Sequence, residues 1–168
     1  RFRIGPDTFF QSNTAQAEKL FARVRELATL HGRPAVALDL FAGTGPIALQ
    51  LAGVADRVVA VESWEPSVLA ARENIALNDV QNVDVVGADV NAALPPGIPE
   101  NVDLVVVDPP RPGLSPEAIA WIAKLAPATV VYVSCNPATL ARDLKLLLQS
   151  PYRIETVEPF DLFPHTFH

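Results

Sequence analysis

The chain has 168 residues, of which 49% are hydrophobic and 19% charged, which is typical of one globular domain with a buried core. Its apolar stretches are too short for a membrane span, and its single cysteine excludes an internal disulfide and a multi-cysteine metal or iron–sulfur site, so we expect a cytoplasmic protein. The net charge of −6 argues against a domain that binds nucleic-acid phosphates by itself.

Apolar, β-branched segments recur along the chain and predict parallel strands covered by helices on both faces. The segments are Ala35–Phe41, Arg57–Val61, Val83–Val86, Val102–Val107, Thr129–Val133 and Tyr152–Val157. Between them lie helical patterns; capping residues before Pro116 and Pro137 mark two helix starts, and the leucine stripe from Leu140 to Leu148 is expected to be core. This alternation predicts an α/β fold, a doubly wound Rossmann-like sheet in one domain over residues 1–168, with ligands at the strands' carboxyl ends.

A glycine-rich turn follows the first predicted strand, in Asp39-Leu-Phe-Ala-Gly43-Thr-Gly45-Pro-Ile-Ala48. Small residues there let the backbone approach a ligand at the start of a helix. Glu62 ends the next strand, where an acid can accept hydrogen bonds from both ribose hydroxyls of NAD or S-adenosylmethionine; a tight turn beside a solvated glutamate is the alternative. Asp39 favours S-adenosylmethionine, because NAD-binding strands usually stay apolar up to the glycines, whereas Asp39-x-Phe-x-Gly-x-Gly resembles the first motif of class I methyltransferases.

Two further aspartates follow predicted strands. Asp89 would lie where the adenine edge lies in that fold, with an exposed loop aspartate as the alternative. Asp108 begins Asp108-Pro109-Pro110-Arg111, and the two prolines make a stiff loop that can hold one polar group against a base or cofactor. Amino-group methyltransferases with a similar Pro-Pro carry an aromatic residue next, so Arg111 makes an exocyclic amine a poorer target.

Cys135 ends the fifth predicted strand in Tyr132-Val-Ser-Cys135-Asn-Pro, directly before a helix. The aligned amides of a helix start favour a thiolate. A lone cysteine is more commonly buried and inert, but this strand end faces the same crevice as Gly43, Glu62 and Asp108. The position therefore predicts a nucleophile.

Five sequence blocks, spread over nearly the whole chain, resemble the RNA uracil-5-methyltransferase family. They are Phe9-Phe-Gln11-x-Asn13, Asp39-Leu-Phe-Ala-Gly-Thr-Gly, Asp108-Pro-Pro-Arg-x-Gly, Ser134-Cys-Asn-Pro-x-Thr-Leu-Ala-Arg-Asp143 and Asp161-x-Phe-Pro-His-Thr-x-His168. The resemblance implies an enzyme in which Cys135 attacks C6 of a uracil in tRNA or ribosomal RNA. It further implies contacts to S-adenosylmethionine from Gln11, Phe41, Glu62, Asp89 and Asp108, beside the turn at Gly43.

The implied reaction requires a thiolate, because C5 of uracil is too weakly nucleophilic to take a methyl group unaided. Addition of Cys135 at C6 makes C5 an enolate carbon that attacks the sulfonium methyl, and a base then removes the C5 proton so that the enzyme can be eliminated. RNA cytosine-C5 methyltransferases generally use two cysteines, so a single cysteine favours uracil. Two alternatives stay open: a methyltransferase of this fold acting on another base or a small molecule, and a fragment that binds the cofactor without turnover.

The chain contains no methionine and is interpreted as a fragment of a longer protein. By resemblance, the family's general base is a glutamate two residues beyond His168, and an RNA-binding barrel precedes this domain, so RNA is expected to bind mainly through absent domains. We expect the sheet to lack its last strand, with Tyr152–His168 displaced, disordered or paired with a neighbouring molecule. His165 and His168 have metal-ligand spacing without an apparent third ligand, so we expect no metal.

Overall fold

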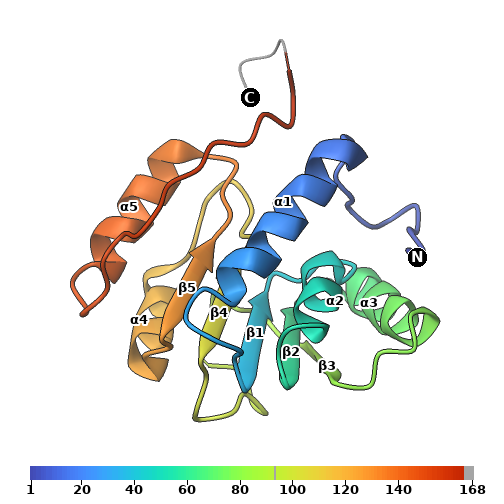
Figure 1. The fold of residues 1–168 in the computed structure, drawn as a ribbon, viewed down its shortest axis with the longest axis horizontal. Coiled ribbons are helices and arrows are strands. Elements are labelled where there is room, and N and C mark those ends of the chain that lie inside the picture. The colour runs from blue at the N-terminus through green and yellow to red at the C-terminus, as the bar shows by residue number, and fades with distance from the viewer. Residues whose placement is uncertain (93, 165–168) are drawn as a thin grey trace.

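The centre of the molecule is a parallel sheet of five strands in the order β3-β2-β1-β4-β5, in a computed structural model that describes residues 1–92 and 94–164 (Figure 1). The strands are β1 (Val36–Leu40), β2 (Arg57–Glu62), β3 (Val83–Gly87), β4 (Leu104–Val107) and β5 (Thr129–Tyr132). The first five predicted strands are therefore confirmed, with small shifts at their ends. The sixth segment, Tyr152–Val157, forms no strand.

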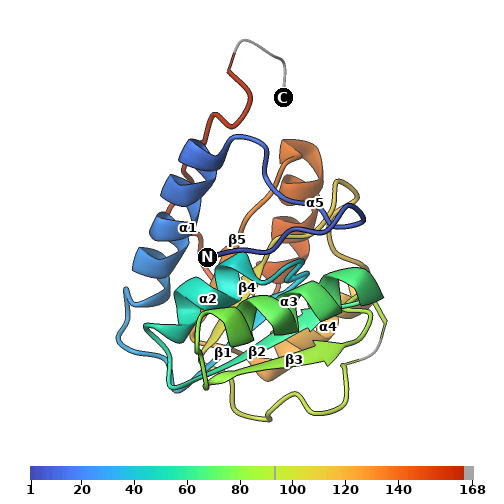
Figure 2. The same cartoon turned by 90° about the vertical axis from the view of Figure 1, so that its right-hand side faces the viewer.

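Helices cover both faces of the sheet (Figure 2). In the described residues they are α1 (Thr14–Ala28), α2 (Pro46–Ala52), α3 (Glu65–Leu77), α4 (Pro116–Leu125) and α5 (Pro137–Leu147). The two predicted capping residues are confirmed: the side chains of Ser115 and Asn136 accept hydrogen bonds from the amides of Ala118 and Ala138. With strands and helices alternating in this way, the α/β doubly wound fold predicted from the sequence is confirmed.

The sheet separates two hydrophobic cores, because successive residues of a strand point to opposite faces. Ala37 of β1 belongs to the core under α1 and α2, whereas Leu38 and Leu40 belong to the core under α4. The predicted leucine stripe of α5 is only partly core, since Leu147 is buried in the α4 core but Leu148 is 41% exposed. A sheet covered on both faces can be reached by a ligand chiefly along its edges.

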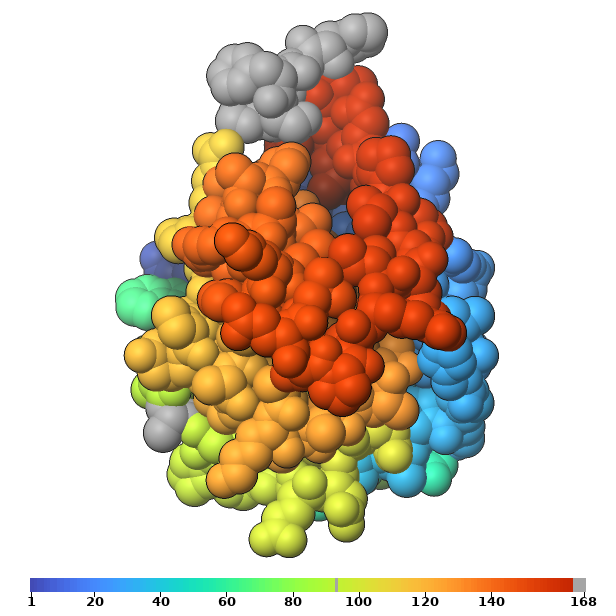
Figure 3. Space-filling view, turned by 90° about the vertical axis from the view of Figure 1, so that its left-hand side faces the viewer, coloured from blue at the N-terminus to red at the C-terminus, as the bar shows by residue number. Residues whose placement is uncertain are grey.

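The segment after α5, residues 152–164, runs outside the sheet between α5 and α1 (Figure 3). Arg23 of α1 donates hydrogen bonds to both carboxylate oxygens of Glu158, from Nη2 to Oε1 at 2.7 Å and from Nε to Oε2 at 2.9 Å and Oε1 at 3.2 Å. Phe160 and Leu162 pack against the core that α1 covers. The expected displacement of this segment from the sheet is therefore confirmed, and β5 stands at the end of the strand order.

Candidate active site

The carboxyl ends of the parallel strands bring most of the predicted site residues to one edge of the sheet. Phe41 and Gly43 follow β1, Glu62 ends β2, Asp89 follows β3, Asp108 follows β4 and Cys135 follows β5. Gln11 precedes α1, whose amino end lies at the same end of the molecule (Figure 1). The topology thus gathers residues that are far apart in the chain.

The turn after β1 is built from left-handed backbone conformations. Gly43 and Gly45 have φ values of 55° and 87°, which glycine adopts without the penalty that a Cβ atom imposes. Phe41 has a φ of 62° although it is not glycine, and such a conformation costs of order 1–3 kcal/mol. Strain of this kind persists only where the surrounding structure holds it, and it favours a functional role for this turn.

Glu62 fastens this turn to the end of β2. Its Oε2 accepts a hydrogen bond from the Gly43 amide at 2.9 Å, and its Oε1 accepts from the amides of Ser63 and Trp64 at 2.8 and 2.7 Å. A carboxylate has roughly four acceptor positions, so about one remains for a ligand hydroxyl. Glu62 is therefore an organised part of the turn rather than a freely solvated side chain.

Two buried polar side chains without hydrogen-bond partners lie at the same strand end. Asp39 is 0% and Thr44 1% exposed, and neither Asp39 carboxylate oxygen nor Thr44 Oγ1 has a partner. Burial, followed by repulsion from Asp108, raises the pKa of Asp39 well above its ordinary value; the Ala48 amide offsets part of the shift without forming a hydrogen bond of normal geometry. Unpaired buried polar groups are costly and rare in folded proteins, so these two side chains distinguish this strand end from the rest of the core.

Asp108 is the second acid with an altered pKa at this edge. Burial raises the pKa of its carboxyl from 3.8 to about 6. Its amide donates to the Leu40 carbonyl at 3.3 Å, which ties the start of the loop after β4 to the end of β1. Two neighbouring acids with raised pKa values are typical of a functional site.

Cys135 is exposed between β5 and α5, so the alternative of a buried, inert thiol is wrong. Asn136, the next residue, caps α5 by accepting from the Ala138 amide at 3.0 Å. Ser134 Oγ accepts from the Asn136 amide at 3.1 Å and donates to the Asn136 carbonyl at 3.1 Å, which fixes the turn. The thiol is thus presented to solvent from an ordered helix start.

Asp89 has the most ordinary surroundings of the predicted residues. It is exposed, and its Oδ1 accepts from the Asn91 amide at 2.9 Å, a contact that shapes the turn after β3. Its predicted contact with adenine stays a prediction.

Sequence reasoning missed Asn74, which is fully buried on α3. Its Nδ2 donates to the carbonyls of Thr44 and Arg3 at 3.0 and 3.1 Å, and its Oδ1 accepts from the Arg3 amide at 2.6 Å. Asn74 therefore joins α3 to the glycine turn and to the amino-terminal segment. The sequence does contain one indication of this role: Asn74 lies on the same helical face as the buried Ala71, and a buried amide side chain requires hydrogen-bond partners.

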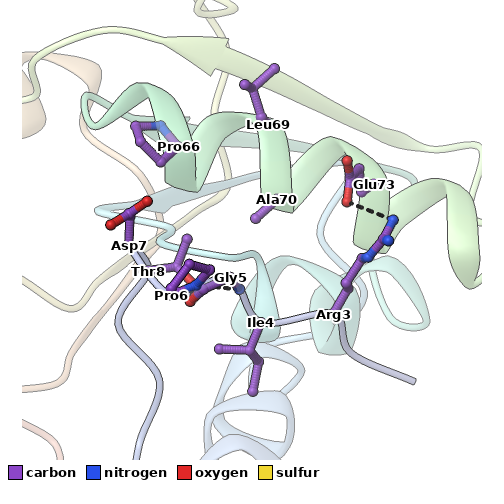
Figure 4. Close-up of a pocket in the computed structure, with 10 residues that line it drawn as sticks. All are labelled: Arg3, Ile4, Gly5, Pro6, Asp7, Thr8, Pro66, Leu69, Ala70 and Glu73. Atoms are coloured by element: carbon purple, nitrogen blue, oxygen red, sulfur yellow. Dashed lines mark hydrogen bonds and ion pairs between the residues drawn. The ribbon is translucent and has the colours of Figure 1, made fainter.

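A cleft of about 490 Å³ lies elsewhere, between the amino-terminal segment and α3 (Figure 4). The ion pair between Arg3 and Glu73, at 3.4 Å, closes one end of it, and Leu69 points away from the segment. None of the predicted site residues lines this cleft. It is therefore separate from the edge that carries Glu62, Asp108 and Cys135.

Among residues 1–92 and 94–164, no group of three or more His, Cys, Asp or Glu side chains has an arrangement that could hold a metal ion. None of the described helices is both long and apolar enough to cross a membrane. His165 and His168, considered above as metal ligands, lie outside the described residues.

A solved structure shares this architecture. The Pyrococcus abyssi tRNA (uracil-54, C5)-methyltransferase, in complex with S-adenosyl-L-homocysteine, aligns with a TM-score of 0.84 and 36% sequence identity over 98% of this chain and 39% of that chain. The parallel sheet and its glycine turn thus have the fold of a class I methyltransferase, as predicted.

The sequence comparisons define the family more narrowly. Residues 1–92 and 100–168 match the tRNA (uracil-5-)-methyltransferase family. Relatives named uncharacterized RNA methyltransferases, from Thermotoga maritima and Gloeobacter violaceus, are 42% and 46% identical over the full chain, which spans 38% and 36% of their lengths. The chain belongs to the tRNA (uracil-5-)-methyltransferase family, which confirms the resemblance drawn from its motifs.

Proposed function

We propose that this chain is the catalytic domain of an enzyme that transfers a methyl group from S-adenosylmethionine to C5 of a uridine in tRNA or ribosomal RNA. The observation that carries the proposal is the exposed thiol of Cys135 at the sheet edge that also bears Asp108 and the glycine turn. Family membership and the uracil-C5 activity named for the Pyrococcus abyssi protein support it. The net charge of −6 supports RNA binding mainly through other parts of the whole protein.

The residues at this edge fit S-adenosylmethionine, the cofactor of the family. When bound, it supplies an electrophilic methyl group on a sulfonium. The remaining acceptor position of Glu62 suits a ribose hydroxyl, and Gly43 lets the backbone come close to the ligand. The Asp108 carboxyl, which is only partly buried and has a pKa of about 6, can carry a negative charge near neutral pH that suits a cationic ligand. Further contacts are proposed for Gln11, Phe41 and Asp89.

In the proposed reaction Cys135 acts as a nucleophile. Its thiolate adds to C6 of uracil, and the electron pair of the C5–C6 double bond moves onto C5 and the adjacent carbonyl, so that C5 becomes nucleophilic. After C5 has been methylated, loss of its proton to a base restores the double bond, and the C6–S bond breaks to release the thiolate. Cys135 lies directly before the cap of α5, so the thiol is held at an ordered helix start while it adds to the base and is released from it.

Trapping on 5-fluorouridine RNA tests the proposal directly, since fluorine at C5 cannot leave as a proton. The intact protein, with S-adenosylmethionine, should form a denaturation-stable adduct with 5-fluorouridine RNA, and Cys135→Ala should form none. Methyl transfer to RNA without an adduct would indicate another base. Cofactor binding without transfer to any RNA would indicate a non-catalytic domain.

A further inference from the structure

Asp143 of α5 is a fully buried carboxylate that none of the roles proposed above uses. Its Oδ2 accepts from the Leu114 amide at 2.8 Å and from the Tyr132 hydroxyl at 2.6 Å, and its Oδ1 accepts from Arg142 Nε at 2.8 Å. Burial, assisted by the bond to Asp143, raises the pKa of Tyr132, so its hydroxyl stays a donor. The carboxylate thus joins the end of β5 and the loop after β4 to α5.

The loop after β4 lies closely against this carboxylate. Arg142 Nη2 donates to the carbonyls of Pro112 and Leu114 at 2.7 and 3.2 Å. Between them, Gly113 has a φ of 77°, and a Cβ atom added to it would overlap Asp143 Oδ2 and lie 2.8 Å from Arg142 Nη2. The loop can approach α5 in this way only because position 113 is glycine.

The earlier part of the same loop is bonded to the first turn of α5. The Arg111 carbonyl accepts from Thr139 Oγ1 at 3.1 Å and from Asn136 Nδ2 at 3.4 Å. Asn136 directly follows Cys135. The loop that starts at Asp108 is therefore attached, near its middle and at its end, to the helix that starts beside the nucleophile.

We propose that Asp143 is a positioning residue: it holds the loop of residues 108–114 against α5, so that the Asp108 carboxyl and the Cys135 thiol keep one relative orientation during the reaction. This inference rests on the proposed function of Cys135. The two groups follow different strands, and a nucleophile must be held to a fraction of an ångström relative to the groups that position the cofactor. Loosening the loop therefore slows the chemical step more than it weakens cofactor binding.

The experiment compares two variants that disturb the attachment from opposite sides, Asp143→Asn and Gly113→Ala, in the intact protein. We expect kcat for RNA methylation to fall at least about tenfold in each, while the Kd for S-adenosylhomocysteine changes less than about twofold. If both substitutions act by breaking the same contact, the double variant should be no less active than the less active of the two single variants, because their effects are then non-additive.

The matched control is Asp103→Asn. Asp103 is likewise an acid that accepts hydrogen bonds from the backbone, from the amides of Ala35 and Val36, but it lies at the opposite edge of the sheet. It should lower thermal stability and leave kcat unchanged. If Asp143→Asn folds poorly, Tyr132→Phe removes one bond to the same carboxylate and takes its place.

Three outcomes separate the possibilities. A kcat loss confined to the variants of this contact supports positioning. Parental kcat in both Asp143→Asn and Gly113→Ala, or losses of kcat and cofactor affinity that merely follow thermal stability as in Asp103→Asn, overturn it. A parent protein that traps no 5-fluorouridine RNA overturns the proposed function and this inference together.

Discussion

Oε2 of Glu62 accepts a hydrogen bond from the amide of Gly43, 19 residues earlier in the chain, at 2.9 Å. The acid that ends β2 therefore also sets the backbone of the turn that ends β1. A ligand that uses this carboxylate meets a group already oriented by protein amides, and little side-chain freedom is lost on binding.

Changing Glu62 to Ala should weaken binding of S-adenosylhomocysteine by about 1–3 kcal/mol, because charge-assisted hydrogen bonds to the ligand are lost and the turn loses its acceptor. Isothermal titration calorimetry measures the change. Glu65→Ala is the control, since Glu65 is an exposed acid three positions on, in the first turn of α3. Unchanged affinity in Glu62→Ala would remove this residue from the proposed ribose contact.

Gly43→Ala and Gly32→Ala separate backbone strain from ligand contact. Both positions have positive φ and no atom within 4 Å of an added Cβ, so each substitution should cost about 1 kcal/mol of folding stability. Only Gly43→Ala should also weaken S-adenosylhomocysteine binding, since its methyl group would occupy the space that the backbone leaves for the ligand. Equal affinity in the two variants would contradict a close approach at this turn.

Asp108 should make the domain less stable as the pH rises from about 4 to about 6, because over that range the unfolded chain releases a proton that the folded carboxyl, with a pKa of about 6, still holds. Asp108→Asn should therefore be more stable than the parent by about 1–3 kcal/mol at pH 7.5 and nearly equal to it at pH 4. Urea unfolding at both pH values tests this. Asp89→Asn, at an exposed strand end, is the control, and a stability difference independent of pH would argue against a buried carboxyl.

Arg23→Gln should loosen residues 152–164 from α1. The Arg23 and Glu158 side chains are 37% and 33% exposed, so salt should weaken the pair in the parent as well. Chymotrypsin, cutting after Phe160 or Leu162, should cleave Arg23→Gln faster than the parent at low salt, and the two should converge at high salt. Arg25→Gln, on an exposed position of the same helix, should behave as the parent. Slow cleavage of Arg23→Gln would mean that Phe160 and Leu162 hold the segment without the ion pair.

Much of the fold could be predicted because its signals are local. The strands are short, largely apolar segments, and the starts of two helices carry Ser115 and Asn136 before a proline. The burial at the end of α5 was harder to predict. Periodicity shows which face of a helix is apolar, but not how far along the helix other elements bury that face, and Leu148 is exposed.

The site residues also differ in whether local sequence signals could predict them. Glu62 and Cys135 could be placed because parallel strands end at a shared edge. Asn74 and Asp143 could not, because a polar residue within a helix is most often solvated, and their burial depends on contacts with segments 71 and 29 residues away in the chain. Only the folded chain brings those partners together.

The central place of β1 also affects synthesis. Its β2 neighbour follows closely, but the Val36 amide finds its acceptor on Asp103, 67 residues later, where β4 begins. At a translation rate of roughly 5–20 residues per second, synthesis of these 67 residues takes roughly 3–13 seconds. During that time the amides and carbonyls on one side of β1 are unpaired. Such an edge can pair with other nascent chains. The arrival of Leu104–Val107 therefore marks the time at which this side of β1 is paired and no longer offers an edge to other chains.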